Sequence, residues 1–169
     1  TGVTTNTQAY KDLHAFNDYF FTSGLVDTSL KDLCDNYTVA QLQAYIDAVA
    51  NKSSALDSAY GSGITNHFFD EGKLAAFKAN CIYAQKVINA KPAITSLNSA
   101  IAAGYDVNNL TEMESIYTAQ KPNIDFLSDK QDIITYVATN YEGYADFSLE
   151  SATAFMEKLF DDIELYKTR

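Results

Sequence analysis

Residues 38–60, with the sequence TVAQLQAYIDAVANKSSALDSAY, decide the fold class of this chain. Apolar side chains recur there at intervals of three and four, which is the spacing of one buried face of an α-helix. That face consists of Val39, Leu42, Ile46, Val49, Ser53, Leu56 and Tyr60. Thr38 followed by Gln41 matches the capping box that opens a helix, and Gly61-Ser62-Gly63 ends it. We therefore predict one helix of about six turns over these residues.

The same helical spacing continues on both sides of this segment. We expect further helices over residues 5–23, 28–35, 70–90, 111–120, 128–142 and 148–166. Short connections join them, and no stretch has a convincing alternation with the period of two that marks a strand. The fold class that follows is all-α, a single-domain helical bundle of about six or seven helices with short loops, spanning residues 1–169.

Proline and capping residues give the expected helix ends. Pro92 either starts a separate helix or kinks the one before it, since Ile94, Leu97 and Ile101 continue the apolar spacing. Pro122 is expected to stop the helix over residues 111–120. Capping boxes are predicted at Thr111–Glu114 and Ser128–Gln131, and Ser148 is expected to cap the last helix.

The charge balance excludes several classes of partner. The chain has 12 Lys and Arg residues against 22 Asp and Glu, which gives a net charge of -10. Nucleic acids need a basic surface, so we expect no nucleic-acid partner. Anionic membranes would repel the chain, and no apolar run is long enough for a transmembrane segment.

Composition favours an extracellular or cell-surface location. The chain begins at Thr1, which predicts either removal of a signal peptide or excision of a module from a longer protein. Arg169 is the only arginine, and tryptophan is absent from the sequence. Glycosylation sequons begin at Asn36, Asn51 and Asn109, although such triplets arise by chance in chains rich in Asn, Ser and Thr.

Cys34 and Cys81 are a candidate disulfide. An oxidising compartment favours the bridge, whereas a simple helical hairpin places the two residues far apart along its axis. The alternative is two buried free thiols, because free cysteine behaves as a small core residue. Both states stay open at this point, and in either we expect both sulfurs to be buried.

Catalytic and cofactor motifs are absent from the sequence, so we expect a non-enzymatic protein without a cofactor. A first candidate metal site is His67 with Asp70 and Glu71, at a spacing that could place all three on one helical face. These acidic residues also suit the first turn of a helix, which is the simpler explanation. A second candidate is a calcium site at Asp106, Asn108 and Glu112. It would be irregular and not an EF-hand, because the glycine and the glutamate that an EF-hand needs are missing from this segment.

Aromatic residues are the most unusual feature, with 12 Tyr and 10 Phe. Phenylalanine in helical stripes is expected in the core, whereas some tyrosines should reach the surface or line a pocket because the hydroxyl needs water or a partner. We expect this of Tyr105, Tyr117, Tyr136, Tyr141, Tyr144 and Tyr166. Exposed tyrosine is favoured at recognition surfaces.

These observations leave three functional hypotheses. The first is a secreted or cell-surface helical module that binds another macromolecule, a protein or a glycan, without catalysis. The second is a helical-bundle carrier of an apolar small molecule such as a fatty acid, held between helices. The third is a metal-dependent protein that uses His67, Asp70 and Glu71.

Overall fold

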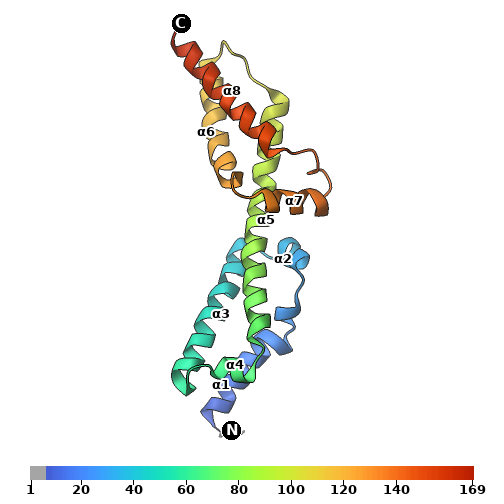
Figure 1. The fold of residues 1–169 in the computed structure, drawn as a ribbon, viewed down its shortest axis with the longest axis vertical. Coiled ribbons are helices and arrows are strands. Elements are labelled where there is room, and N and C mark those ends of the chain that lie inside the picture. The colour runs from blue at the N-terminus through green and yellow to red at the C-terminus, as the bar shows by residue number, and fades with distance from the viewer. Residues whose placement is uncertain (1–6) are drawn as a thin grey trace. The chain divides into compact units, whose positions relative to one another are not determined.

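The computed structural model describes residues 7–169, apart from the side chains of Asn66, His67 and Glu71. Within that range every regular element is a helix, and the predicted all-α bundle with short loops is confirmed (Figure 1). The α-helices are α1 (Gln8–Asn17), α2 (Leu30–Asn36), α3 (Val39–Tyr60), α4 (Ile64–Phe68), α5 (Glu71–Ala103), α6 (Leu110–Leu127), α7 (Gln131–Asn140) and α8 (Leu149–Lys167). A π-helix, η1 (Asp18–Thr22), continues α1, and a 3-10 turn, η2 (Leu25–Asp27), follows it.

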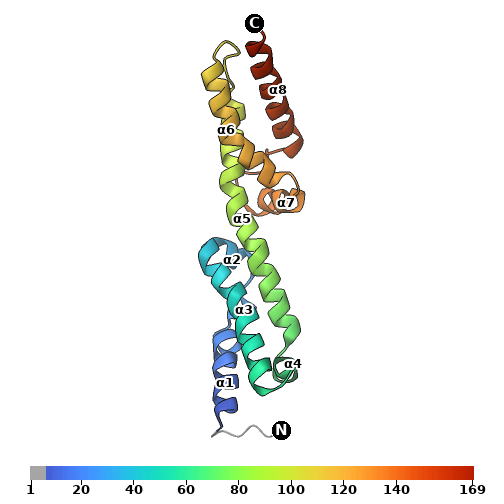
Figure 2. The same cartoon turned by 90° about the vertical axis from the view of Figure 1, so that its left-hand side faces the viewer.

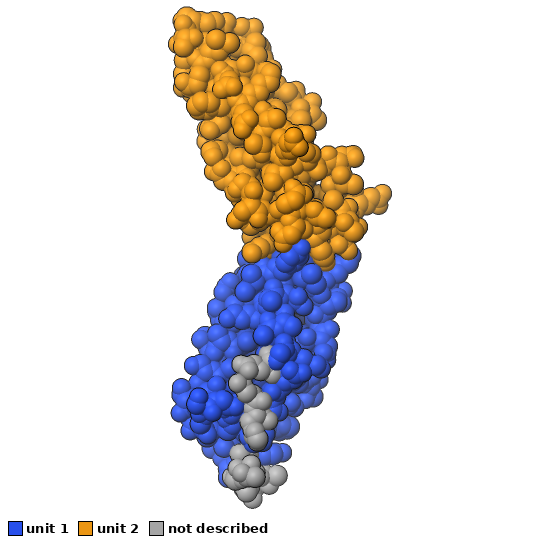
Figure 3. All heavy atoms as spheres, viewed as in Figure 1, with its two compact units in different colours: residues 1–85 blue, residues 86–169 orange. Residues whose placement is uncertain are grey.

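The second half of the chain contains the C-terminal part of α5 together with α6, α7 and α8. Figure 2 shows α6 and α8 side by side there, and their residues pack against one another. Residues 1–85 and residues 86–169 form two compact units (Figure 3). Helix α5 supplies residues to both units, so each unit has a core built partly on this helix. A single domain over residues 1–169 stays a prediction.

The core of the first unit is aromatic. Phe20 is fully buried, and its ring lies 5.0 Å from that of Phe16 and 6.4 Å from that of Phe77. Leu33 and Leu42 complete this core without exposed surface. Apolar residues of the predicted helices over 5–23, 28–35, 38–60 and 70–90 are therefore buried in this core.

The capping box of α3 is confirmed. The Thr38 hydroxyl accepts a hydrogen bond from the Gln41 amide at 3.1 Å, and the Gln41 side chain accepts one from the Thr38 amide at 2.9 Å. Both orphan donors at the start of the helix are thereby satisfied. The helix ends at Gly61, whose φ of 122° is a conformation that glycine adopts without a steric penalty.

The core of the second unit is aliphatic. Its fully buried residues include Leu97 of α5, Met113 and Leu127 of α6, Val137 of α7 and Leu159 of α8. One polar side chain, Gln120, is only 7% exposed and is hydrogen-bonded on both sides. Its Nε2 donates to Ser96 Oγ at 2.9 Å, and its Oε1 accepts from Asn123 Nδ2 at 3.0 Å.

Several predicted helix ends are wrong. The Thr111–Glu114 box does not form, because Asn109 caps α6 and accepts from the Glu112 amide at 3.0 Å. The Ser128–Gln131 box does not form either, since α7 begins after Lys130 without a side-chain cap.

The two prolines do not end helices. Pro122 lies inside α6, and Pro92 lies inside a continuous α5. Both proline rings are exposed to solvent, so water can reach the backbone around them. The predicted stop at Pro122 is wrong for this reason, whereas Ser148 caps α8 as expected, at 3.2 Å from the Ser151 amide.

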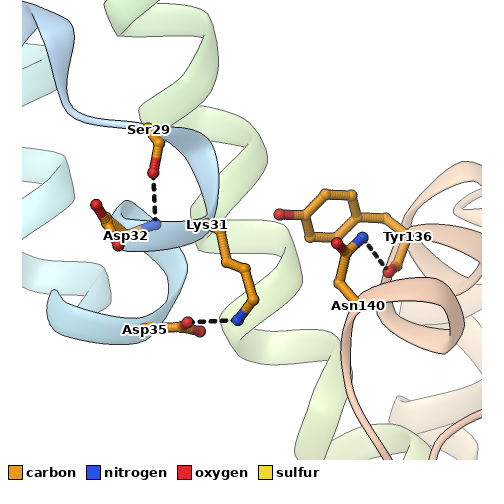
Figure 4. Close-up of polar contacts among 6 residues, drawn as sticks. All are labelled: Ser29, Lys31, Asp32, Asp35, Tyr136 and Asn140. Carbon is orange, nitrogen blue, oxygen red and sulfur yellow. Dashed lines mark hydrogen bonds and ion pairs between the residues drawn. The ribbon is translucent and has the colours of Figure 1, made fainter.

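The short helices α2 and α7 carry local polar contacts, drawn in Figure 4. Ser29 caps α2 by accepting from the Asp32 amide at 3.2 Å, and Lys31 forms an ion pair with Asp35 at 2.6 Å. In α7 the Asn140 amide donates to the Tyr136 carbonyl at 2.9 Å. Because Ser29 is the cap, α2 begins at Leu30, two residues later than the predicted residue 28.

Candidate functional site

An open groove of about 620 Å³ lies between α6 and α8 in the second unit. Its floor is apolar, because Ile124 of α6 and Met156 of α8 are 7% and 5% exposed. Two aromatic rings form one wall, with the centroids of Tyr117 and Phe160 5.9 Å apart. Phe160 is 47% exposed, which is unusual for a large apolar side chain next to a core.

The helical register explains why Phe160 faces the groove. The buried face of α8 contains Ala152, Met156, Leu159 and Ile163, at intervals of four, three and four. Phe160 lies outside this stripe by one residue, on the side that faces Tyr117 of α6. Phe160 is not among the functional residues predicted from the sequence. The signal that could have identified it is a large apolar residue between Glu157 and Asp161 on a polar helical face.

The rim of the groove is acidic. Asp125, Glu157 and Asp161 line it together with one basic residue, Lys121. Lys121 is bound to Asp125 at 2.5 Å, and this hydrogen bond raises the pKa of the lysine. Among the described side chains, Glu157 and Asp161 have no cationic partner. They are exposed and lie four residues apart on α8, which is a repulsive arrangement for like charges.

The groove continues into a second depression of about 560 Å³. Both share Thr153 and Glu157, and the second also touches Leu149 and Glu150 at the start of α8. The combined surface follows α8 from residue 149 to residue 161. At 1.5 Å per residue this is about 18 Å, the length of a helix of about twelve residues.

The first unit has a groove of about 530 Å³ between the α1–η1 segment and α3, whose polar groups are already paired. The Lys52 ammonium lies 4.9 Å from the centre of the Tyr19 ring. The Tyr60 hydroxyl donates to Asp12, and this bond lowers the pKa of Asp12. Its two charged residues therefore already have tyrosine partners within the groove, and the groove between α6 and α8 is the better candidate for a binding site.

The candidate metal site at His67, Asp70 and Glu71 falls largely outside the described residues. The side chains of His67 and Glu71 are among those that the structure does not describe. Asp70 accepts a hydrogen bond from the Lys73 amide at 3.3 Å, as a first-turn carboxylate does. Over the side chains that are described, no three His, Cys, Asp or Glu residues form a group that could hold a metal ion.

The loop at Asp106, Asn108 and Glu112 is organised by protein contacts. Asp106 accepts from the Asn108 amide at 2.9 Å, and Glu112 accepts from the Asp106 amide at 3.5 Å. The guanidinium of Arg169 donates to Asn108 Oδ1 at 3.1 Å and to the Val107 carbonyl at 3.3 Å. A permanent cation beside Asn108 opposes calcium binding, so the calcium hypothesis is not supported by this geometry.

Cys34 and Cys81 do not lie at disulfide distance from each other, so the candidate bridge between them is corrected. Cys81 is fully buried on the core face of α5, and burial raises the pKa of its thiol to about 11. Cys34 is partly exposed, whereas its neighbour Leu33 on the short helix α2 is fully buried. The expectation that both are buried is therefore met only by Cys81.

The tyrosines of the second half are all half-buried. Tyr105 donates to Asp162 at 2.7 Å, while Tyr141 stacks against the Lys91 ammonium at 4.0 Å. The first contact joins the segment after α5 to α8, and the second joins the segment after α7 to α5. Only Tyr117 of the six predicted residues lines the groove between α6 and α8.

Comparison with known proteins identifies no relative: no family model, curated protein or solved structure matches the chain. Within residues 7–169, no helix has the length and apolar character needed to cross a bilayer.

Proposed function

We propose that the chain is a non-catalytic helical module that binds another polypeptide in the groove between α6 and α8. The observation that carries this proposal is the half-exposed Phe160 beside Tyr117, over a floor of Ile124 and Met156. A partner that covers Phe160 removes its apolar surface from water, which is the main favourable term in association. Aromatic anchors in a partly desolvated pocket are the usual centres of binding energy at protein interfaces.

The chemistry of the groove favours binding over catalysis. Among the described residues, its lining contains hydroxyl groups at Ser128 and Thr153 but no histidine or cysteine that could activate or replace them. Its carboxylates at Asp125, Glu157 and Asp161 are exposed, whereas a catalytic acid needs a buried setting that raises its pKa.

The carrier hypothesis is less well supported. The groove is open to solvent along its length, whereas a carrier encloses most of its ligand. A fatty acid would also bring its carboxylate close to Glu157 and Asp161, which have the same charge.

An extracellular or cell-surface location remains part of the proposal. It is supported by the composition, and the three sequon residues Asn36, Asn51 and Asn109 are all exposed. Fractionation of the cells that make the protein tests this location independently of any binding assay.

The binding function can be tested by selection from a displayed library of amphipathic helical peptides with random polar positions. The full chain is the bait, and Phe160→Ala is the counter-selection bait. We expect peptides that bind the wild-type chain and lose at least tenfold in affinity for Phe160→Ala. Leu165→Ala is the matched control, because Leu165 is 66% exposed on α8 and does not line the groove. Failure to enrich any Phe160-dependent peptide would refute the proposal.

A further inference from the structure

We infer that the occupant of this groove is a basic amphipathic helix, with apolar residues that cover Phe160 and lysine or arginine residues that meet Glu157 and Asp161. This inference rests on the proposed function and specifies the partner. Two features carry it: the shape of the surface along α8 and the uncompensated negative charge on one side of that surface.

The shape suits a helix. The groove follows α8 for about 18 Å, with apolar side chains at Leu149 near one end, at Met156 in the floor and at Phe160 near the other end. These residues succeed one another at intervals of seven and four, so they form one line along α8. An apolar stripe of a partner helix, repeating at three and four residues, would match this line.

The negative charge along the groove favours a positively charged partner. Glu150, Glu157 and Asp161 line the groove on the α8 side, and no cation among the described residues pairs with them. On the α6 side Lys121 already neutralises Asp125. The other lysine near this part of α8, Lys158, is committed to Asp162 at 2.6 Å. A basic partner therefore meets free carboxylates on one side only, which gives the bound helix a preferred rotation about its axis.

The same charge excludes other occupants. A second copy of this chain would bring a net charge of -10 to the groove. The second unit itself contains thirteen acidic and seven basic side chains, so the unit that carries the groove is acidic in its own right. An anionic lipid surface is opposed for the same reason.

The test uses three acetylated and amidated peptides of about twelve residues with identical leucine stripes. Their polar positions are all lysine, all glutamine or all glutamate. Fluorescence anisotropy measures the affinity of each peptide for the full chain. We expect the lysine peptide to bind at least tenfold more tightly than the glutamine peptide, and the glutamate peptide to bind most weakly. Added salt should reduce this preference, because both charges are exposed.

A pair of double variants separates local charge from net charge. Glu157→Gln with Asp161→Asn should abolish the preference for lysine over glutamine. Glu142→Gln with Asp146→Asn removes the same charge from exposed positions outside the groove, and should leave the preference within twofold of the wild type. Equal loss in both double variants would overturn the inference, because the peptide would then respond to net charge alone.

The inference and the proposed function fail in different ways. If the lysine and glutamine peptides bind equally and both depend on Phe160, the groove binds helices but the inference about charge is wrong. If none of the peptides binds in a Phe160-dependent manner, and library selection also enriches none, both proposals are wrong.

Discussion

Phe77 and Phe155 show how burial decides the importance of a single aromatic residue. They lie in the helices predicted over residues 70–90 and 148–166, but Phe77 is 1% exposed while Phe155 is half-buried against Tyr105. Phe77→Ala removes a ring packed against Phe20 and Tyr45, and leaves a cavity. We expect a loss of about 3–5 kcal/mol in the free energy of unfolding for Phe77→Ala. Phe155→Ala should cost about 1–2 kcal/mol, since solvent already reaches the site.

Urea titration followed by circular dichroism measures both losses. The spectrum of the wild-type chain should be dominated by helix, well above the roughly one-third of an average domain. Equal losses for the two variants would contradict the burial that distinguishes them.

Asp162 gives a pH-dependent prediction. Its carboxylate accepts from Lys158 at 2.6 Å and from Tyr105 at 2.7 Å, and these bonds lower its pKa below the ordinary value of 3.8. The stability that it contributes is therefore complete above 3.8 and is lost as the pH falls through the lowered folded-state pKa. At neutral pH we expect Asp162→Asn to be less stable than Asp161→Asn, which removes the same charge without losing these bonds.

The comparison of the two asparagine variants is made by urea unfolding at neutral pH and again well below pH 3.8. The difference between them should shrink in acid. A difference that persists unchanged would mean that Asp162 acts through packing and not through its charge.

At the scale of the helix, Pro92 is a residue that α5 tolerates at a cost. Proline has no N–H to donate to the carbonyl of Ile88, and its ring crowds that turn. Because Pro92 is exposed, Pro92→Ala restores the hydrogen bond without disturbing the core. We expect this variant to be more stable by about 1–3 kcal/mol, after allowance for the greater entropy of the unfolded chain.

Thermal unfolding measures this gain, with Lys91→Ala as a neighbouring control. Lys91 lies over the Tyr141 ring, so its loss should destabilise the chain slightly. A lower melting temperature for Pro92→Ala would show that the packing of α5 depends on the shape that the proline imposes.

Local signals were predictable from the sequence, whereas signals that depend on neighbouring helices were not. The capping box at Thr38 and Gln41 forms because both partners lie within one turn. At the start of α6 the sequence offers two residues that can cap the helix, and Asn109 forms the cap in place of Thr111. The groove could not be predicted, because it requires Ile124 and Met156 to meet, and no periodicity specifies that α6 lies beside α8.

The whole chain has two cores that share one helix, and their stabilities can be measured separately. Phe77→Ala weakens the core formed by residues 1–85. We expect faster amide hydrogen exchange in α3, whereas α6 and α8 should exchange within about twofold of the wild-type rate, because local opening follows local packing. Leu159→Ala should produce the reverse pattern, since Leu159 is buried in the second core.

Mass spectrometry of exchanged peptides resolves the two halves. Equal acceleration in both halves for either variant would establish one cooperative domain over residues 1–169. A separate response would instead divide the chain into two folding units at the boundary between residues 85 and 86.

The buried amide of Gln120 restricts how α6 can align with α5. Aliphatic side chains would accept a slide of one helical turn, about 5.4 Å, with modest repacking. Gln120 would not, because its hydrogen bond to Ser96 of α5 depends on the present alignment, whereas the bond from Asn123 lies within α6 itself. An unsatisfied buried amide costs about 1–3 kcal/mol. One polar side chain thus gives an otherwise permissive aliphatic core a unique register, and with it a fixed position for every residue that α6 presents to the groove.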